Sequence, residues 1–141
     1  MGRGKRITIL GAGSWGTALA VHLGVSGVEC MLWGRDQGLI DQMIDLRENP
    51  KYLPGVTIPE GVKFTSSLEE ATSFGEILFL VVPSHGMRSI VTQVKGLLDR
   101  QGLAEKVYVS CAKGVENESL AFMSEVIEDV LGKEISDSIA V

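Results

Sequence analysis

Residues 6–16 read RITILGAGSWG, a stretch in which a short apolar run leads directly into a glycine-rich turn. The run from Arg6 to Leu10 is rich in β-branched residues and stops at a glycine, as a buried parallel strand does. From Ser14 the pattern becomes helical, with Leu19 and Leu23 four residues apart on one face. The stretch therefore predicts a strand, a tight turn and a helix in immediate succession.

The glycines of this turn match the pattern G-x-G-x-x-G in the context that dinucleotide binding requires, after a strand and at the start of a helix. Gly11 permits the tight turn, and Gly13 lets the backbone approach a pyrophosphate without a Cβ in the way. Gly16 allows the helix to pack closely on the strand. The free N–H groups of the helix start then bind the anion. The alternative is an ordinary βα turn that holds no ligand.

A second determinant of such sites lies about 20 residues further on, at the end of the next strand. This strand is predicted at Val28 to Trp33, and Gly34, Arg35 and Asp36 follow it. Arg35 suits the 2′-phosphate of NADP, and its guanidinium can also stack on adenine. Asp36 comes one position later and can simply cap the next helix. The pattern favours NADP over NAD, with dual use or a plain surface charge at Arg35 as alternatives.

Strand and helix patterns alternate along the whole chain, which is typical of a parallel sheet with helices on both faces. The first helix ends at Ser26-Gly27, and residues 50–61 form an irregular stretch marked by proline and glycine. The further strands expected are Val62–Thr65, Glu76–Val82, Val107–Cys111 and Ser138–Val141. The further helices expected are Asp36–Leu46, a short one at Ser66–Glu70, Ser84–Leu98 and Ser119–Leu131. The prediction is an α/β fold with a doubly wound, mostly parallel, Rossmann-type sheet, formed by one domain over residues 1–141.

Ligands of open α/β sheets bind outside the carboxyl ends of the strands. Two of these ends carry polar residues, in the runs 82–85 (Val-Pro-Ser-His) and 110–114 (Ser-Cys-Ala-Lys-Gly). Lys113 places a positive charge beside a glycine, which suits an anionic substrate or a cofactor phosphate. His85 has a side chain suited to acid–base catalysis, but no carboxylate partner can be named, and a packing or cofactor contact at the helix start is favoured.

Composition excludes several classes of function. The 18 acidic and 13 basic residues give a net charge of −5, whereas nucleic-acid-binding domains carry a basic excess. No apolar run approaches the ~18–20 residues that span a bilayer, so membrane insertion is not expected. The only cysteines, Cys30 and Cys111, sit in apolar segments without zinc-type spacing, which predicts buried reduced thiols, no metal site and a cytoplasmic protein.

A set of motifs spread over essentially the whole chain resembles bacterial NAD(P)-dependent glycerol-3-phosphate dehydrogenase. The motifs occupy residues 11–20 (GAGSWGTALA), 32–36 (LWGRD), 52–56 (YLPGV), 81–85 (VVPSH) and 112–116 (AKGVE). Taken together and in this order, they are far more specific than the glycine pattern alone. The family often has Thr where Ala112 stands, a small departure that does not affect the match at Lys113.

The resemblance implies hydride transfer between dihydroxyacetone phosphate and sn-glycerol 3-phosphate, which feeds phospholipid synthesis. By matching position, Ser14, Trp15, Arg35 and Lys113 would contact NADP or NAD, and Lys113 would also meet the small phosphorylated substrate. Tyr52 would line the adenine or the substrate side. The parent enzyme would be a cytoplasmic homodimer.

In this family the last strand leads into an all-helical C-terminal domain that supplies the general-acid lysine. The chain stops at Val141, about where that segment should begin, so an N-terminal fragment without a catalytic residue, inactive by itself, is expected. One alternative is another dehydrogenase with a helical second domain, of the ketopantoate, 6-phosphogluconate or pyrroline-carboxylate type. A second is a non-catalytic module that senses the nucleotide.

Overall fold

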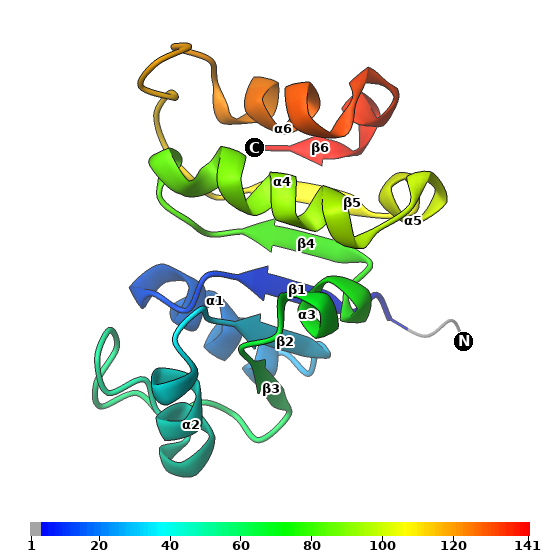
Figure 1. Ribbon diagram of the computed structural model, residues 1–141. Coiled ribbons are helices and arrows are strands. Elements are labelled where there is room, and N and C mark those ends of the chain that lie inside the picture. Colours follow the sequence, from blue (N-terminus) through cyan, green and yellow to red (C-terminus); the bar gives the residue numbers. More distant parts are fainter. Residues whose placement is uncertain (1–3) are drawn as a thin grey trace.

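The computed structural model describes residues 4–141, in which six parallel strands form one sheet in the order β3-β2-β1-β4-β5-β6 (Figure 1). The strands are β1 (Ile7–Leu10), β2 (Cys30–Trp33), β3 (Val62–Thr65), β4 (Ile77–Leu80), β5 (Val107–Ser110) and β6 (Ile139–Ala140). The chain starts at the centre, runs to one edge, crosses back and runs to the other edge. The predicted doubly wound fold is confirmed, and the direction of winding reverses between β1 and β4.

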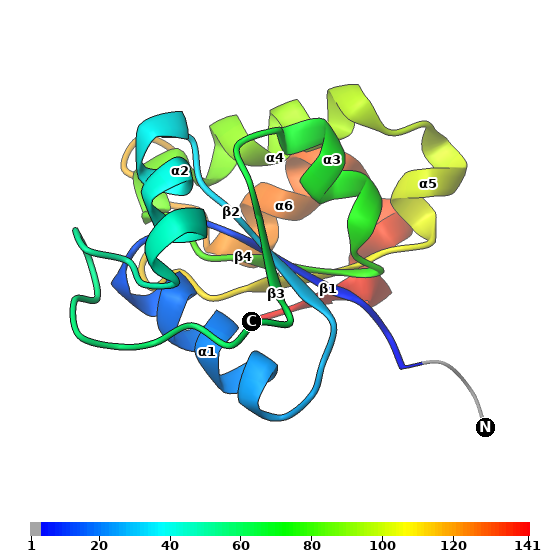
Figure 2. The ribbon, with the colours of Figure 1, turned by 90° about the horizontal axis from the view of Figure 1, so that it is seen from below.

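Helices cover both faces of this sheet. They are α1 (Ser14–Val25), α2 (Gln37–Leu46), α3 (Leu68–Phe74), α4 (Met87–Leu97), α5 (Arg100–Ala104) and α6 (Met123–Leu131), with the 3-10 turns η1 (Ser84–Gly86) and η2 (Lys133–Ser138). Figure 2 shows α1 on one side of the sheet and α4 and α6 on the other. The helices α1 and α2 share one hydrophobic cluster with the sheet, while α3, α4 and α6 share a second.

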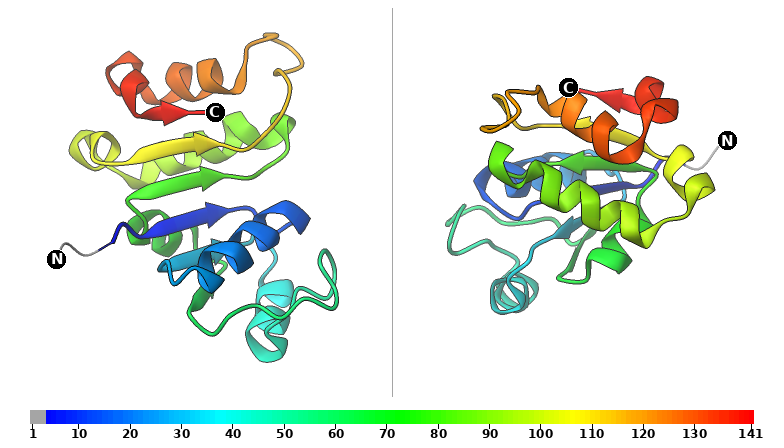
Figure 3. Two further views of the ribbon diagram at one scale, coloured as in Figure 1. Left: turned by 180° about the vertical axis from the view of Figure 1, so that it is seen from behind. Right: turned by 45° about the horizontal axis from the view of Figure 1, so that its top comes forward.

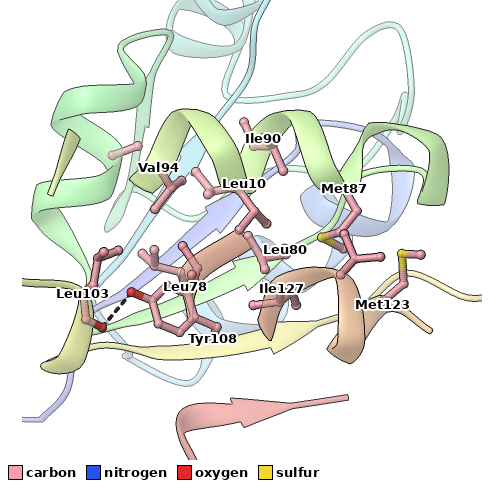
Figure 4. Packing of buried hydrophobic residues seen from close by; sticks show 14 of the residues in the cluster. Leu10, Leu78, Leu80, Met87, Ile90, Val94, Leu103, Tyr108, Met123 and Ile127 are labelled. Atoms are coloured by element: carbon pink, nitrogen blue, oxygen red, sulfur yellow. Dashed lines mark hydrogen bonds between the residues drawn. The ribbon is translucent and has the colours of Figure 1, made fainter. Parts of the chain in front are cut away.

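The strand β1 contributes to both clusters because neighbouring residues of a strand point to opposite faces. Ile7 and Ile9 pack under α1 and α2, whereas Leu10 packs under α3 and α4. In the second cluster the Tyr108 hydroxyl donates to the carbonyl of Leu103 at 2.8 Å, which satisfies the one polar group of this buried ring (Figure 4). The alternation makes β1 the common element of the two cores.

The helix caps follow the sequence where the signal is local. Asp36 caps α2 by accepting from the Leu39 N–H at 3.2 Å, and Ser67 caps α3 by accepting from the Glu70 N–H at 3.2 Å. Gly27, which follows α1, has a φ of +78° that suits its predicted place after the helix. The predictions at Asp36 and Gly27 are confirmed, whereas the short helix expected at Ser66–Glu70 is found at Leu68–Phe74, with Ser67 as its cap.

Other predicted bounds are wrong. The last long helix begins at Met123 instead of Ser119, because Leu120 has a φ of +59°, which an α-helix cannot contain, and Glu125 caps the helix by accepting from the Phe122 N–H. The segment after Pro83 starts as the turn η1, and α4 follows it. The helix α5 and the turn η2 were not predicted from the sequence. Cys30 is buried as expected, but Cys111 is only half-buried.

The carboxyl ends of the strands gather the loops that the sequence singled out. In the left view of Figure 3, the turn after β1, the long loop between α2 and β3, and the loop after β5 all lie at the edge to which the arrowheads point. Residues 1–3 of the predicted domain 1–141 lie outside the described residues, so the domain assignment stays a prediction.

Candidate functional site

The glycine-rich turn after β1 uses its three glycines in different ways. Gly11 has a φ of +134°, and a Cβ there would lie 2.1 Å from the carbonyl oxygen of Val81. A Cβ on Gly16 would lie 1.8 Å from the carbonyl oxygen of Gly11. A Cβ on Gly13 would meet nothing within 4 Å. The first and third glycines are therefore required by the fold, while the second borders open space.

Open space at Gly13 coincides with the start of α1. Gly13 is the N-cap residue, and the first intrahelical bond there runs from the Thr17 N–H to the Gly13 carbonyl at 3.0 Å. The N–H groups that precede this bond have no intrahelical acceptor, and the helix dipole adds positive potential at the same place. The N-cap residue is a glycine and has no side chain that could occupy these donors. The arrangement offers backbone donors to an anion and leaves room for it.

Arg35 lies beside this turn at the end of β2. The register pairs Leu10 with Trp33, and a Cβ on Gly34 would lie 2.9 Å from the Cβ of Ala12, so the backbone before Arg35 packs directly on the turn. The Arg35 side chain is exposed. Because the Asp36 carboxylate caps α2, the acidic side chain at this edge already has a structural partner.

The ends of β4 and β5 lie level with the end of β1. The register aligns Leu10 with Leu80 and Leu80 with Ser110, and the Val81 N–H donates to the Leu10 carbonyl at 2.9 Å. Lys113 follows β5 by three residues, is exposed, and precedes a glycine with a φ of +96°. The fold thus brings Lys113 to the same edge of the sheet as the glycine turn.

His85 lies in η1 at the end of β4, and its side chain is exposed. Pro83 precedes this turn and is its N-cap residue. The structure places this histidine at the predicted edge. Within residues 4–141, its side chain makes no contact that would support a role in acid–base catalysis.

The loop that carries Lys113 is held by an arginine on α4. The Arg88 guanidinium donates to both carboxylate oxygens of Glu116, at 2.8 and 3.0 Å, and also to Asp129 at 2.6 Å. The hydrogen bonds from Arg88 and from the Ser119 hydroxyl lower the pKa of Glu116 to about 2. A bidentate pair of this kind fixes direction as well as distance, so it anchors the loop three residues beyond Lys113.

A second segment, residues 49–55, flanks the glycine turn, and most of it was predicted only to be irregular. The Ser14 hydroxyl donates to the carbonyl of Tyr52 at 2.8 Å, so this side chain is committed to the protein. Trp15 on the turn is 59% exposed and Tyr52 is 42% exposed, and both present aromatic rings to solvent near the helix start. The buried Asn49 belongs to the same segment and was missed, because its bonds to Ala12 and Thr17 join residues that are distant in sequence.

Among residues 4–141, no group of three or more His, Cys, Asp and Glu side chains could hold a metal ion. None of the helices in the same range is long and apolar enough to cross a membrane. Burial raises the pKa of the Cys30 thiol to about 11, and burial also raises the pKa of Cys111. Neither thiol therefore has the lowered pKa of a reactive cysteine.

Comparisons with known proteins point to one family. Residues 6–141 match the profile of the NAD-dependent glycerol-3-phosphate dehydrogenase N-terminus. The chain is 40% identical over 130 residues to glycerol-3-phosphate dehydrogenase [NAD(P)+] of Thermoanaerobacter sp. (strain X514), covering 92% of this chain and 38% of the relative. It is 44% identical over 126 residues to glycerol-3-phosphate dehydrogenase [NAD(P)+] 2 of Salinibacter ruber, covering 89% and 36%.

A solved structure of the same family has a similar fold. The crystal structure of glycerol-3-phosphate dehydrogenase from Coxiella burnetii superposes with a TM-score of 0.82 at 34% identity, over 91% of this chain and 38% of that one. The chain thus spans less than two fifths of the length of these relatives. A match that extends from Arg6 to Val141 shows that the chain belongs to the family of NAD-dependent glycerol-3-phosphate dehydrogenases, of which it represents the N-terminal part.

Proposed function

We propose that this chain binds NADP or NAD at the carboxyl edge of its sheet, as the cofactor-binding part of a longer sn-glycerol-3-phosphate dehydrogenase. The observation that carries the proposal is the open space at Gly13, where a helix start presents backbone N–H groups. This helix start lies beside the point, between β1 and β4, at which the direction of winding reverses. Dinucleotides bind at this place in doubly wound sheets. The proposal covers residues 1–141 as one dinucleotide-binding domain.

The pyrophosphate would lie on the turn formed by residues 11–16. Gly11 and Gly16 keep the turn tight, because side chains at either position would collide with backbone. Gly13 leaves the approach clear, and the backbone around Ser14 and Trp15 supplies the donors. The exposed ring of Trp15 offers an apolar surface beside the same turn.

Arg35 would select the cofactor. An exposed guanidinium that follows the backbone packed on the turn can pair with a 2′-phosphate through two parallel hydrogen bonds. Since Asp36 caps α2, its carboxylate is less available for a ribose hydroxyl. Both features support a preference for NADP over NAD.

Lys113 would meet the phosphate of the substrate or of the cofactor. It is exposed at the end of β5, and the Arg88–Glu116 pair holds its loop. An ammonium group on an anchored loop at this edge suits a small phosphorylated compound, for which dihydroxyacetone phosphate and glycerol 3-phosphate are the proposed substrates. When bound, the reduced nicotinamide would supply the hydride to dihydroxyacetone phosphate, and the oxidised nicotinamide would accept it from glycerol 3-phosphate.

No residue of this chain is proposed as the catalytic acid. Hydride transfer requires the substrate to be held in a near-attack geometry, and the edge described here forms one wall of such a site. We expect the general-acid lysine in the remainder of the longer enzyme, so this chain alone would be nearly inactive. A cytoplasmic location, a homodimeric parent enzyme, a role in phospholipid synthesis and no binding of nucleic acid complete the proposal.

Calorimetric titration of the chain with NADPH and NADH tests the function, with Arg35→Ala as the variant. Arg100→Ala is the matched control, because Arg100 is also exposed but begins α5 before β5, at the opposite edge of the sheet. We expect tighter binding of NADPH than of NADH, and a loss of this preference in Arg35→Ala alone. The proposal fails if neither nucleotide binds, and the role of Arg35 fails if both variants keep the preference.

A further inference from the structure

Asn49 lies under the glycine-rich turn with its side chain completely buried. Its Nδ2 donates to the carbonyl of Ala12 at 3.0 Å and to the hydroxyl oxygen of Thr17 at 2.9 Å. Its Oδ1 accepts from the N–H groups of Lys51 at 3.3 Å and Tyr52 at 3.0 Å. The amide thus uses both of its donor hydrogens and accepts two hydrogen bonds.

These bonds cross-link two segments that are far apart in sequence. Residues 49–53 form a closed loop, in which the Leu53 N–H donates to the Asn49 carbonyl at 3.0 Å. The start of this loop is anchored by Arg47, whose guanidinium donates to the carbonyls of Pro59 and Val62. Asn49 therefore connects the glycine turn to a loop that is itself held in place.

Packing alone does not explain an amide at this position. A buried amide is costly unless its hydrogen bonds are made, and an apolar side chain would fill the space without that requirement. A fully satisfied buried polar group instead specifies one geometry of the backbone that it contacts. The backbone that Asn49 specifies is the peptide unit between Ala12 and Gly13.

This peptide unit contains both the Ala12 carbonyl and the Gly13 N–H. Because a trans peptide is planar, its carbonyl and its N–H point in opposite directions. Asn49 holds the carbonyl toward the interior, so the N–H of Gly13 faces away from Asn49. The bond from Asn49 to Thr17 adds a second attachment, at the first residue of α1 whose N–H is bonded within the helix.

We propose that Asn49 is a positioning residue for the dinucleotide site, which fixes the direction of the Gly13 N–H and thereby the affinity of the turn for a pyrophosphate. The inference rests on the proposed cofactor binding and adds a residue outside the glycine pattern. Asn49 acts through the Ala12–Gly13 peptide unit. Its loss should therefore weaken the binding of ligands that carry a pyrophosphate, and leave unchanged the binding of ligands that reach only the Arg35 side.

The variant Asn49→Ser separates the two sets of bonds. A serine hydroxyl can still accept an N–H bond within its own turn, but it is too short to replace the bond to the Ala12 carbonyl. Ile127→Val is the control, because it removes a methyl group from a fully buried side chain of α6 on the other face of the sheet. The probes are NADPH and adenosine 2′-monophosphate, which lacks the pyrophosphate.

We expect Asn49→Ser to lower NADPH affinity about tenfold, as the loss of a buried hydrogen bond does, while adenosine 2′-monophosphate binds unchanged. Ile127→Val should alter neither affinity. Equal losses for both ligands, or equal losses in both variants, would overturn the inference. If Asn49→Ser does not fold, Thr17→Val is the second variant, because it removes one acceptor of the same amide. It should weaken the binding of NADPH severalfold and leave the binding of adenosine 2′-monophosphate unchanged. Undiminished NADPH affinity in Thr17→Val would overturn the inference.

Amide NMR relaxation of Gly13 keeps this test separate from the test of cofactor binding. If the unaltered chain binds no NADPH, the proposed function fails, and the relaxation data then decide the role of Asn49 on their own. We expect the Gly13 amide to gain fast motion in Asn49→Ser and not in Ile127→Val. An equally ordered Gly13 amide in the serine variant would contradict the positioning role.

Discussion

Alanine substitutions at Gly13 and Gly16 should separate binding from folding within one turn. The two glycines are three residues apart, yet a Cβ on Gly13 meets nothing within 4 Å, while a Cβ on Gly16 lies 1.8 Å from the Gly11 carbonyl oxygen. We expect Gly13→Ala to fold normally and to bind NADPH poorly, because the methyl group would occupy the space of the pyrophosphate. We expect Gly16→Ala to be destabilised.

The structure sets the size of both effects. Gly13 has a φ of −83°, which alanine adopts freely, so a gain of about 0.4–1 kcal/mol from the less flexible unfolded chain offsets the poorer N-cap. At Gly16 the contact of 1.8 Å must open to at least 3.0 Å, so the helix must retreat by more than about 1 Å. This costs about 3 kcal/mol, as severe overpacking does. Better helix propensity returns about 1 kcal/mol. The net loss in free energy of unfolding is therefore about 2 kcal/mol.

Urea unfolding followed by circular dichroism measures the free energy of unfolding, and calorimetric titration measures the affinity for NADPH. Gly13→Ala should keep the unfolding free energy within about 1 kcal/mol of the parent and lose affinity about tenfold or more. Parental affinity in Gly13→Ala would refute the placement of the pyrophosphate. Parental stability in Gly16→Ala would refute the packing argument, since the collision is between backbone and Cβ.

Two further substitutions test the electrostatics and the core. The pKa of Glu116 is lowered from 4.5 to about 2, so the unfolding free energy should fall as the pH drops from 4.5 toward 2. Glu116→Gln should flatten that decline in urea unfolding at a series of pH values; an unchanged slope would contradict the Arg88 pairing. Tyr108→Phe removes the buried hydroxyl that bonds to Leu103, and should cost about 1 kcal/mol at neutral pH. Burial raises the pKa of Tyr108 from 10.0 to about 12. The unfolding free energy of the parent should therefore fall as the pH rises from 10 toward 12, and that of the variant should fall less. Parallel pH profiles would contradict the burial of this hydroxyl.

Sequence reasoning succeeded where the signal is local or follows from topology. The cap at Asp36 depends on the N–H three residues ahead, which a sequence displays directly. The placement of Arg35 and Lys113 at one edge followed from the rule that parallel strands end together. Neither prediction required knowledge of any distant contact.

The features that were missed depend on distant contacts or on unusual backbone. Asn49 looks like any loop asparagine in the sequence, and only its bonds to Ala12 and Thr17 give it a role. The late start of α6 depends on a left-handed conformation at Leu120, which a leucine rarely adopts. The helix α5 has five residues, too few for a periodic pattern, and its cap at Asp99 is the one local sign of it.

The central position of β1 has a consequence for the order in which the protein assembles during synthesis. A ribosome releases β1, β2 and β3 first, so half of the sheet can pair while the rest of the chain is still being made. The other neighbour of β1 is β4, and the carbonyl of Val81 that confines Gly11 arrives with it. A nascent chain can therefore form the α1 layer early, but its nucleotide-binding turn acquires its final walls only when β4 docks.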